Sequence, residues 1–388
     1  MTDTWSHVDP DGLMEYSVVY TDRALNHMSA RFKHVLVDIS AVLKRVYNAY
    51  SSIIVPGSGT FGMEAVARQF AGGEPVLVLR NGWFSYRWSQ ILDTGGIPIS
   101  TTVLKARRNA HDHHAPFVPA PIDEVVATIR CERPAVVFAP HTETSAGLRL
   151  PADYLQAVGA AVHEHGGLFV LDCIASGVDW VDMQACGVDV LISAPQKGWS
   201  ATPCCAMVML SAHARKRIED TRSSSYACDL RKWLEIMETY EAGGQAYHAT
   251  MPTDGLVRLL DMMRETEVLG FERLRERQYE LGRKVRGLLE AHGFASVAAD
   301  GFQSSGVVVS YTDDDEIQSG RRFAQAGVQI AAGVPLMCDE GESFSSFRIG
   351  LFGLDKLQHV DEAVARFEQA LVHVAKARAD VTARGAVS

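Results

Sequence analysis

Short runs of Val, Ile and Leu alternate with helix-length amphipathic segments over the first half of the chain. Runs that are apolar on both faces are typical of strands buried in a mainly parallel sheet, and crossover helices between them give a three-layer α/β domain. The sequence predicts strands at 52–55, 76–79, 97–103, 135–139, 168–171, 188–193 and 206–210. Helical periodicity predicts helices at 60–70, 122–129 and 152–165, so the pattern indicates a seven-stranded sheet with helices on both faces.

The pattern changes after about Pro252, where a long amphipathic stretch begins and Gly270 predicts a break between two helices. Short strands are expected at 306–311, 329–331 and 346–350, and a final helix at 359–376. This combination is typical of a smaller α+β domain. We therefore predict an N-terminal arm at 1–20, a large domain at 21–262 and a small C-terminal domain at 263–388.

Composition narrows the class of protein but not its chemistry. The chain has 388 residues and a formal net charge of −10, which argues against nucleic acid or an anionic membrane as a partner. No apolar run reaches the roughly 18 residues of a membrane span, and the N-terminus lacks the features of a secretory signal. Seven cysteines without a CxxC pair predict neither disulfides nor a zinc site. We expect a cytoplasmic protein.

A cluster of histidines is the other place where a metal could be sought. His111, His113 and His114 stand among arginines and prolines, which predicts an exposed loop rather than a metal site. The sequence therefore predicts no metal.

A glycine-rich turn follows the first predicted strand, in IIVPGSGTFGMEAVARQF. Glycines allow the backbone to approach an anion, hydroxyls add donors, and a helix N-terminus contributes its positive end. The turn therefore indicates a phosphate site, although a plain strand–turn–helix would look the same. It lacks the lysine of a Walker loop, and the acidic residue of a dinucleotide-binding fold is missing from its expected place.

Two charged residues follow later strands at the edge where open α/β sheets bind ligands. Asp172 ends the strand in GGLFVLDC, and Lys197 follows the next strand in ISAPQKGW, between Pro195 and Pro203. Taken singly, the aspartate could cap a loop and the lysine could be an ordinary surface residue. The ordered triple of phosphate turn, aspartate and lysine fits pyridoxal phosphate, which needs a phosphate cup, an acid for its pyridine nitrogen and a lysine for its aldehyde.

With these motifs, the sequence resembles the class V aminotransferases, which are fold-type I pyridoxal-phosphate enzymes, and is most similar to their alanine–glyoxylate and serine–pyruvate branch. The resemblance covers about 52–353. It implies that Asp172 binds the pyridine nitrogen and that Lys197 forms the Schiff base. It also implies roles for residues that hold the phosphate (Ser58, Gly59, Thr60 and Gln196), stack on the ring (Phe84), place a hydroxyl beside the cofactor (Thr144), reach the phosphate of a neighbouring subunit (Tyr247 and Thr250) and bind the substrate carboxylate (Arg348).

The expected activity is transamination between an amino acid and a 2-oxo acid such as glyoxylate or pyruvate, by a homodimer with sites at its interface. The family's usual PGP segment is replaced by VVYTDRALNHMS, and the run after the lysine is SATPCC, so substrate identity stays open. A lyase on the same cofactor is the alternative, with Cys338 as the only candidate loop nucleophile. A non-enzymatic binding module would not need Asp172, Lys197 and Arg348 together, and a nucleotide-dependent oxidoreductase would leave the lysine and aspartate without a role.

Overall fold

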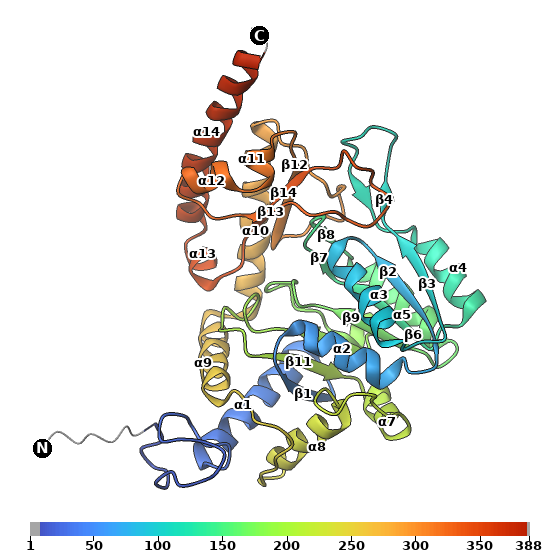
Figure 1. Ribbon diagram of the computed structural model, residues 1–388, viewed down its shortest axis with the longest axis vertical. Helices are drawn as coiled ribbons and strands as arrows, with labels where there is room; N and C mark the ends of the chain where they lie inside the picture. Colours follow the sequence, from blue (N-terminus) through green and yellow to red (C-terminus); the bar gives the residue numbers. More distant parts are fainter. Residues whose placement is uncertain (1–7, 386–388) are drawn as a thin grey trace, which may run out of the picture.

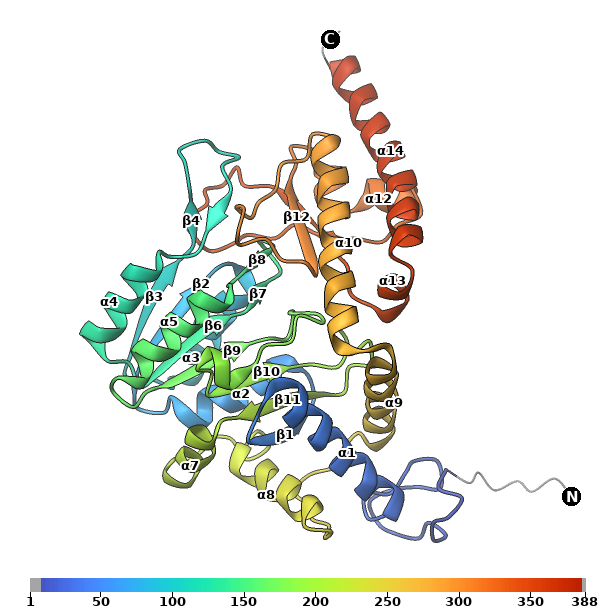
Figure 2. The ribbon, with the colours of Figure 1, turned by 180° about the vertical axis from the view of Figure 1, so that it is seen from behind.

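The computed structural model describes residues 8–385, so residues 1–7 of the predicted arm lie outside the described part. A large part holds a twisted sheet between two layers of helices, and a smaller part stands beside it at the C-terminal end of the chain (Figure 1). Helices α2 and α3 cover one face of the sheet, while α4 and α5 cover the other, as the view from behind makes plain (Figure 2). The described part of the chain contains no helix that is long and apolar enough to cross a membrane.

The large sheet has seven strands in the order β1-β11-β10-β9-β6-β2-β3. Its strands are β1 (Ser51–Pro56), β2 (Pro75–Arg80), β3 (Ser100–Lys105), β6 (Val136–Pro140), β9 (Leu168–Asp172), β10 (Val190–Ser193) and β11 (Cys205–Leu210). All neighbours pair in parallel except β11, which is antiparallel to both β1 and β10. The prediction of a seven-stranded, mainly parallel sheet is confirmed.

Two details of the predicted sheet are wrong. The strand expected at 97–103 runs from Ser100 to Lys105, because Ile97 turns into the core while Ile99 is 73% exposed. This strand lies at one edge of the sheet. It is only partly buried, whereas the other six strands are almost entirely buried. Also, no helix separates β10 from β11: antiparallel neighbours need no crossover, and a loop at 194–204 joins them.

The predicted helices at 60–70, 122–129 and 152–165 correspond to α2 (Gly59–Phe70), α4 (Ile122–Glu132) and α5 (Ala152–His163). The remaining helices of the large part are α1 (Ala30–Tyr47), α3 (Trp83–Gly95), α6 (Met183–Cys186), α7 (Ala212–Asp220), α8 (Leu230–Glu241) and α9 (Thr253–Leu269). Short strand pairs are β4 (Arg107–Arg108) with β5 (Phe117–Val118) and β7 (Thr142–Glu143) with β8 (Leu148–Arg149).

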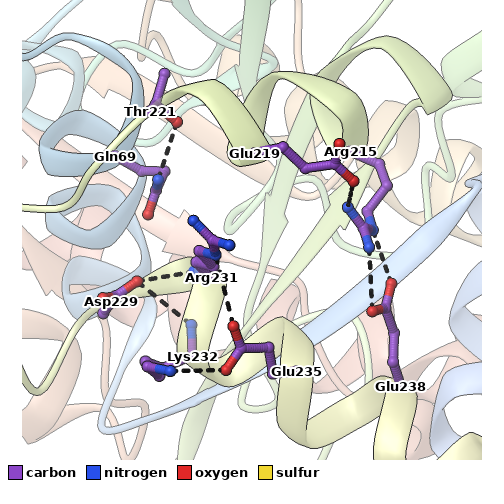
Figure 3. A network of polar contacts seen from close by, with 9 residues as sticks. All are labelled: Gln69, Arg215, Glu219, Thr221, Asp229, Arg231, Lys232, Glu235 and Glu238. Carbon is purple, nitrogen blue, oxygen red and sulfur yellow. Dashed lines mark hydrogen bonds and ion pairs between the residues drawn. The ribbon is translucent and has the colours of Figure 1, made fainter.

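Helices α7 and α8 are joined by a set of side-chain contacts close to the β1 edge of the sheet. Arg215 binds Glu238 of α8 through its Nε at 2.7 Å and Glu219 of its own helix through its Nη1 at 3.1 Å (Figure 3). Asp229 accepts hydrogen bonds from the backbone of Arg231 and Lys232 and so caps the start of α8. These contacts orient α8, whose apolar face packs over β1.

The smaller part contains a three-stranded antiparallel sheet in the order β12-β14-β13. Its elements are α10 (Phe271–Ala291), β12 (Val307–Tyr311), α11 (Asp315–Gln318), α12 (Arg321–Gln325), β13 (Ala331–Ala332), β14 (Ser346–Gly350), α13 (Leu354–Gln358) and α14 (Val360–Gly385). Gly270, with a φ of 88°, separates α9 from α10 as predicted. The predicted domain boundary at 262/263 falls within α9, and the division into an arm and two domains stays a prediction.

Candidate active site

The glycine-rich turn joins β1 to α2 and leaves the start of α2 open for an anion. Gly57 has a φ of 123°, and Ser58 is the N-cap, although its side chain makes no capping hydrogen bond. The first N–H groups of a helix lack partners within the helix and carry its positive end. A Cβ on Gly59 would lie 2.6 Å from the Ile174 side chain, so the turn is pressed against the loop that follows Asp172. The expected phosphate turn and the expected acid are therefore neighbours.

Asp172 lies at the C-terminal end of β9 and is 9% exposed. Its Oδ1 accepts a hydrogen bond from the N–H of Ile174 at 2.9 Å. Burial raises the pKa of its carboxyl to about 6, while the Ile174 N–H and the charge of Lys197 act in the opposite direction. Asp172 pairs in register with Ile192 of β10, the strand that leads to Lys197.

The loop that carries Lys197 is held by close backbone packing. A Cβ on Gly198 would lie 2.1 Å from the carbonyl oxygen of Gly177, so only glycine fits there. Trp199 is fully buried, and its ring centroid lies 4.6 Å from that of Trp180. The loop is thereby anchored at Gly198 and Trp199, the two residues that follow the lysine.

The side chain of Lys197 is half-buried, and several charged groups act on its amine. Burial lowers the pKa of this amine, with the negative charge of Asp172 opposing the change. Its Nζ lies 5.7 Å from the ring centroid of Phe352. A cavity of about 380 Å³ adjoins the lysine and is also lined by Gln196, whose side chain is exposed, and by Arg258 of α9.

Phe84 links the two parts of the molecule through two guanidinium groups. The guanidinium carbon of Arg348, on β14, lies 5.4 Å from the Phe84 ring centroid, and that of Arg87 lies 5.3 Å away. Arg87 also donates from Nη1 to the Oγ1 of Thr60 at 3.0 Å. The contacts thus run from the phosphate turn through Arg87 and Phe84 to Arg348.

The sequence motifs did not predict Arg87 as a site residue. Its position one helical turn after Phe84 could have indicated that the two side chains lie on the same face of the helix. Burial lowers the pKa of Arg348, and the negative charge of Glu143 opposes this effect. Glu143 was also missed. It directly precedes Thr144, whose hydroxyl is buried and has no hydrogen-bond partner among the described residues.

Tyr247 and Thr250 lie away from these groups, in the segment between α8 and α9. The Tyr247 hydroxyl is 3.2 Å from that of Thr250, and the Tyr247 side chain is 54% exposed. In the described part of a single chain, neither residue forms a hydrogen bond with the phosphate turn or with the Lys197 loop. The His27 ring packs on Tyr247, with the ring centroids 5.5 Å apart.

The residues at the edge of the sheet fit pyridoxal phosphate. An open helix N-terminus suits its phosphate, a buried carboxyl suits its pyridine nitrogen, and an amine with a lowered pKa suits its aldehyde. The unpartnered Thr144 hydroxyl provides a further group for a bound molecule.

Within residues 8–385, two groups have the ligand types of a metal site: His113, His114 and Asp313, and His163, Asp189 and His213. Asp189 already accepts hydrogen bonds from the Phe169 N–H, the Ser211 hydroxyl and His163, so its burial is accounted for without an ion. All seven cysteines are free. His111 and His113 are exposed as predicted, whereas His114 is half-buried.

Together, the fold and site define an α/β fold-type I pyridoxal-phosphate enzyme. The chain belongs to the class-V aminotransferases, because the family's sequence model matches residues 12–349. It is an aminotransferase that uses pyridoxal phosphate, as expected from the motifs.

Individual relatives are distant. The chain is 25% identical over 354 residues to the soluble hydrogenase small subunit of Synechococcus, covering 90% of this chain and 88% of that protein. It is 23% identical over 367 residues to the alanine–glyoxylate aminotransferase of Oryctolagus cuniculus, covering 91% and 88%. The crystal structure of an alanine–glyoxylate aminotransferase from Nostoc superposes with a TM-score of 0.75 at 21% identity, covering 90% of this chain and 89% of that one, which shows the fold.

Proposed function

We propose that this aminotransferase transfers the amino group of an amino acid to a small 2-oxo acid such as glyoxylate or pyruvate, with Lys197 as the catalytic amine. One observation carries the proposal. Asp172 and Lys197 lie at the ends of adjacent parallel strands at the same edge of the sheet, next to the phosphate turn, and the charge of Arg348 acts on the Lys197 amine. The similarity to an alanine–glyoxylate aminotransferase supports the choice of acceptor.

Each charged residue has a distinct part in this reaction. Arg348 binds the substrate carboxylate, since a guanidinium group matches a carboxylate with two hydrogen bonds. The Nζ of Lys197 takes the α-proton of the substrate and returns it, and its lowered pKa keeps more of the amine neutral for this purpose. When bound, pyridoxal phosphate supplies the aldehyde that binds the amino group and a ring that accepts electrons. Asp172 keeps a proton at the ring nitrogen.

The remaining predicted residues hold the cofactor. The start of α2, with Ser58, Gly59 and Thr60, receives the phosphate, and Gln196 adds a contact from the neighbouring loop. The Phe84 ring stacks on the pyridine ring, and the Thr144 hydroxyl lies beside the cofactor. The open N-terminus of α2 and the unpartnered Thr144 hydroxyl support these roles.

The active unit in this proposal is a homodimer in the cytoplasm. Tyr247 and Thr250 reach the phosphate bound by the neighbouring subunit, which accounts for their exposure in the single chain. Apolar side chains of the N-terminal segment are also exposed, and exposed patches of this kind mark interfaces: Leu13, Met14, Tyr16 and Val18. Seven free cysteines fit a reducing compartment.

Replacement of the lysine tests the proposed function. Lys197→Ala should abolish the absorption band of the cofactor bonded to the enzyme, together with amino transfer. Lys284→Ala is the matched control, because this lysine forms surface ion pairs with Glu280 and Asp361. A band that persists unchanged in Lys197→Ala would overturn the assignment.

The lyase alternative finds no support at Cys338. This thiol is 5% exposed and donates from Sγ to the carbonyl oxygen of Arg80, and burial raises its pKa to about 12. Such a thiol supplies very little thiolate near neutral pH. With an amino donor alone, an aminotransferase accumulates the amino form of the cofactor, whereas a lyase releases product and regenerates the aldehyde form.

A further inference from the structure

Glu143 is a fully buried carboxylate that the proposed reaction does not use. Five hydrogen bonds reach it: from the N–H of Phe84 at 3.2 Å, from the N–H and Oγ of Ser85 at 2.8 and 2.7 Å, and from the N–H and Oγ of Ser145 at 3.0 and 2.7 Å. In the part of the chain that the structure describes, no basic side chain forms an ion pair with it. Its direct partners are therefore backbone N–H and hydroxyl groups.

Three of these donors, on Phe84 and Ser85, belong to the first turn of α3. Glu143 binds two of the N–H groups that have no partner inside the helix, and a third, that of Trp83, donates to the Ser145 hydroxyl at 2.9 Å. The approach is so close that a Cβ on Gly82 would lie 2.0 Å from Ser145 Oγ and 2.7 Å from Glu143 Cγ. The carboxylate thus fixes where the helix begins and the direction in which its first side chains leave it.

Phe84 is one of those side chains, and its backbone N–H is bound directly by Glu143. Its ring is the group that contacts Arg87 and Arg348. The charge of Glu143 is also felt by the groups around it: it opposes the effect of burial on the pKa of Arg348 and of Lys197. A negative charge at this place therefore affects both the position of the stacking ring and the cations that surround it.

We propose that Glu143 is a positioning residue for the cofactor: it holds the first turn of α3 so that the Phe84 ring can stack, and it keeps a negative charge beside the cationic groups of the site. This proposal rests on the proposed role of Phe84. Burying a carboxylate without an ionic partner is costly. Backbone N–H groups bind both of its oxygens, which a neutral amide with a single oxygen could not match.

The test replaces Glu143 by glutamine, which keeps the shape but removes the charge and one acceptor. Apoprotein is reconstituted with pyridoxal phosphate, and the dissociation constant, the circular dichroism of the bound cofactor and the pH midpoint of its absorbance are measured. We expect cofactor binding about tenfold weaker, because buried N–H groups at the start of α3 lose an acceptor and the Phe84 ring loses its fixed position. The dichroism should change, and the pH midpoint should move down because a nearby negative charge favours the protonated form.

A matched control is Glu340→Gln, because Glu340 also accepts hydrogen bonds from backbone N–H groups, those of Leu336, Met337 and Cys338, without contacting Phe84. This variant should keep the dichroism and the midpoint of the wild type. In a Phe84→Ala background, the Glu143→Gln change should weaken cofactor binding by less than in the wild type, because part of its effect acts through that ring.

A purely structural role predicts a different result. If Glu143→Gln lowers thermal stability but keeps the wild-type dissociation constant, dichroism and midpoint, the proposal is wrong. Where that variant does not fold, Ser145→Ala removes the hydroxyl that bridges Trp83 and Glu143 but keeps the charge. It should weaken cofactor binding and change the dichroism, and wild-type values of both would overturn the proposal. Failure of the wild-type apoprotein to bind pyridoxal phosphate would contradict the proposed function instead.

Discussion

The buried carboxyl of Asp172 should make the cofactor-free protein less stable at neutral pH, and Asp172→Asn should remove this cost. Burial raises its pKa from 3.8 to about 6, so the folded protein holds a proton that the unfolded chain has released. Between these two values, unfolding releases protons, and stability falls as the pH rises. The penalty is absent below pH 3.8 and complete above about pH 6.

The structure sets the size of the effect. The shift from 3.8 to about 6 is about 2.2 pH units, which at 1.36 kcal/mol per unit gives about 3 kcal/mol. At pH 5 about half of this penalty is present. Asparagine keeps an Oδ1 for the Ile174 N–H, so the comparison isolates the charge. Cofactor-free Asp172→Asn should therefore be more stable than the wild type by up to about 3 kcal/mol at pH 7.

Urea unfolding of both cofactor-free proteins, at equal concentration between pH 5 and pH 8, measures this difference. Asp189→Asn is the opposing control, because Asp189 is also buried. Burial acts to raise its pKa, but hydrogen bonds from His163 and the Phe169 N–H outweigh this and lower the pKa, so removal of this carboxylate should destabilise the protein. Equal stability of Asp172→Asn and the wild type at pH 7 would refute the reasoning. In the presence of pyridoxal phosphate the order should reverse, since the asparagine no longer holds a proton at the ring nitrogen.

Three further changes test other parts of the site and fold. Arg348→Gln should raise the KM of the 2-oxo acid by tenfold or more in steady-state assays, because the carboxylate loses a bidentate partner; an unchanged KM would contradict its role. Tyr247→Phe and Thr250→Ala should each weaken cofactor binding. When either variant is mixed with Lys197→Ala subunits, each heterodimer should contain one working site, because that site combines the intact residues of both subunits; a monomeric enzyme would not show this recovery. Gly62→Ala should lower the free energy of unfolding by about 1–3 kcal/mol in denaturant titrations, since its Cβ would lie 2.5 Å from that of Ala206. A Cβ on Gly287 would meet nothing within 4 Å, so Gly287→Ala should stabilise α10 by about 0.5–1 kcal/mol.

The positions of the phosphate turn, Asp172 and Lys197 could be predicted because each is defined by its place just after a buried strand. Such a place is visible in the sequence, since an apolar run ends there and glycine or proline follows. The direction of a strand is not visible in the same way. An apolar run reads alike in both directions, so the antiparallel β11 was not anticipated.

The residues that surround the predicted site could not be found by the same means. Glu143 binds Ser85, which is 58 positions away, and no local pattern connects them. The adjacent aromatic residues Trp83 and Phe84 are equivalent in sequence. Only the structure, which shows where α3 begins, distinguishes their surroundings. The Phe84 ring contacts Arg87 and Arg348, while the Trp83 ring packs on Tyr86.

The charge of the site differs in sign from that of the whole chain. The molecule carries −10, yet Lys197 and the charged groups that act on it are three cations and two carboxylates: Lys197, Arg87, Arg348, Asp172 and Glu143. The pKa of Asp172 is raised by burial, so near pH 6 this carboxyl carries less than a full negative charge and the positive excess is larger still. Burial also lowers the pKa of both Lys197 and Arg348, which means that their positive charges lack full compensation in the cofactor-free chain. A phosphate at the start of α2 and a carboxylate at Arg348 would supply that compensation, so the same electrostatic imbalance that is costly in the empty site favours the binding of cofactor and substrate together.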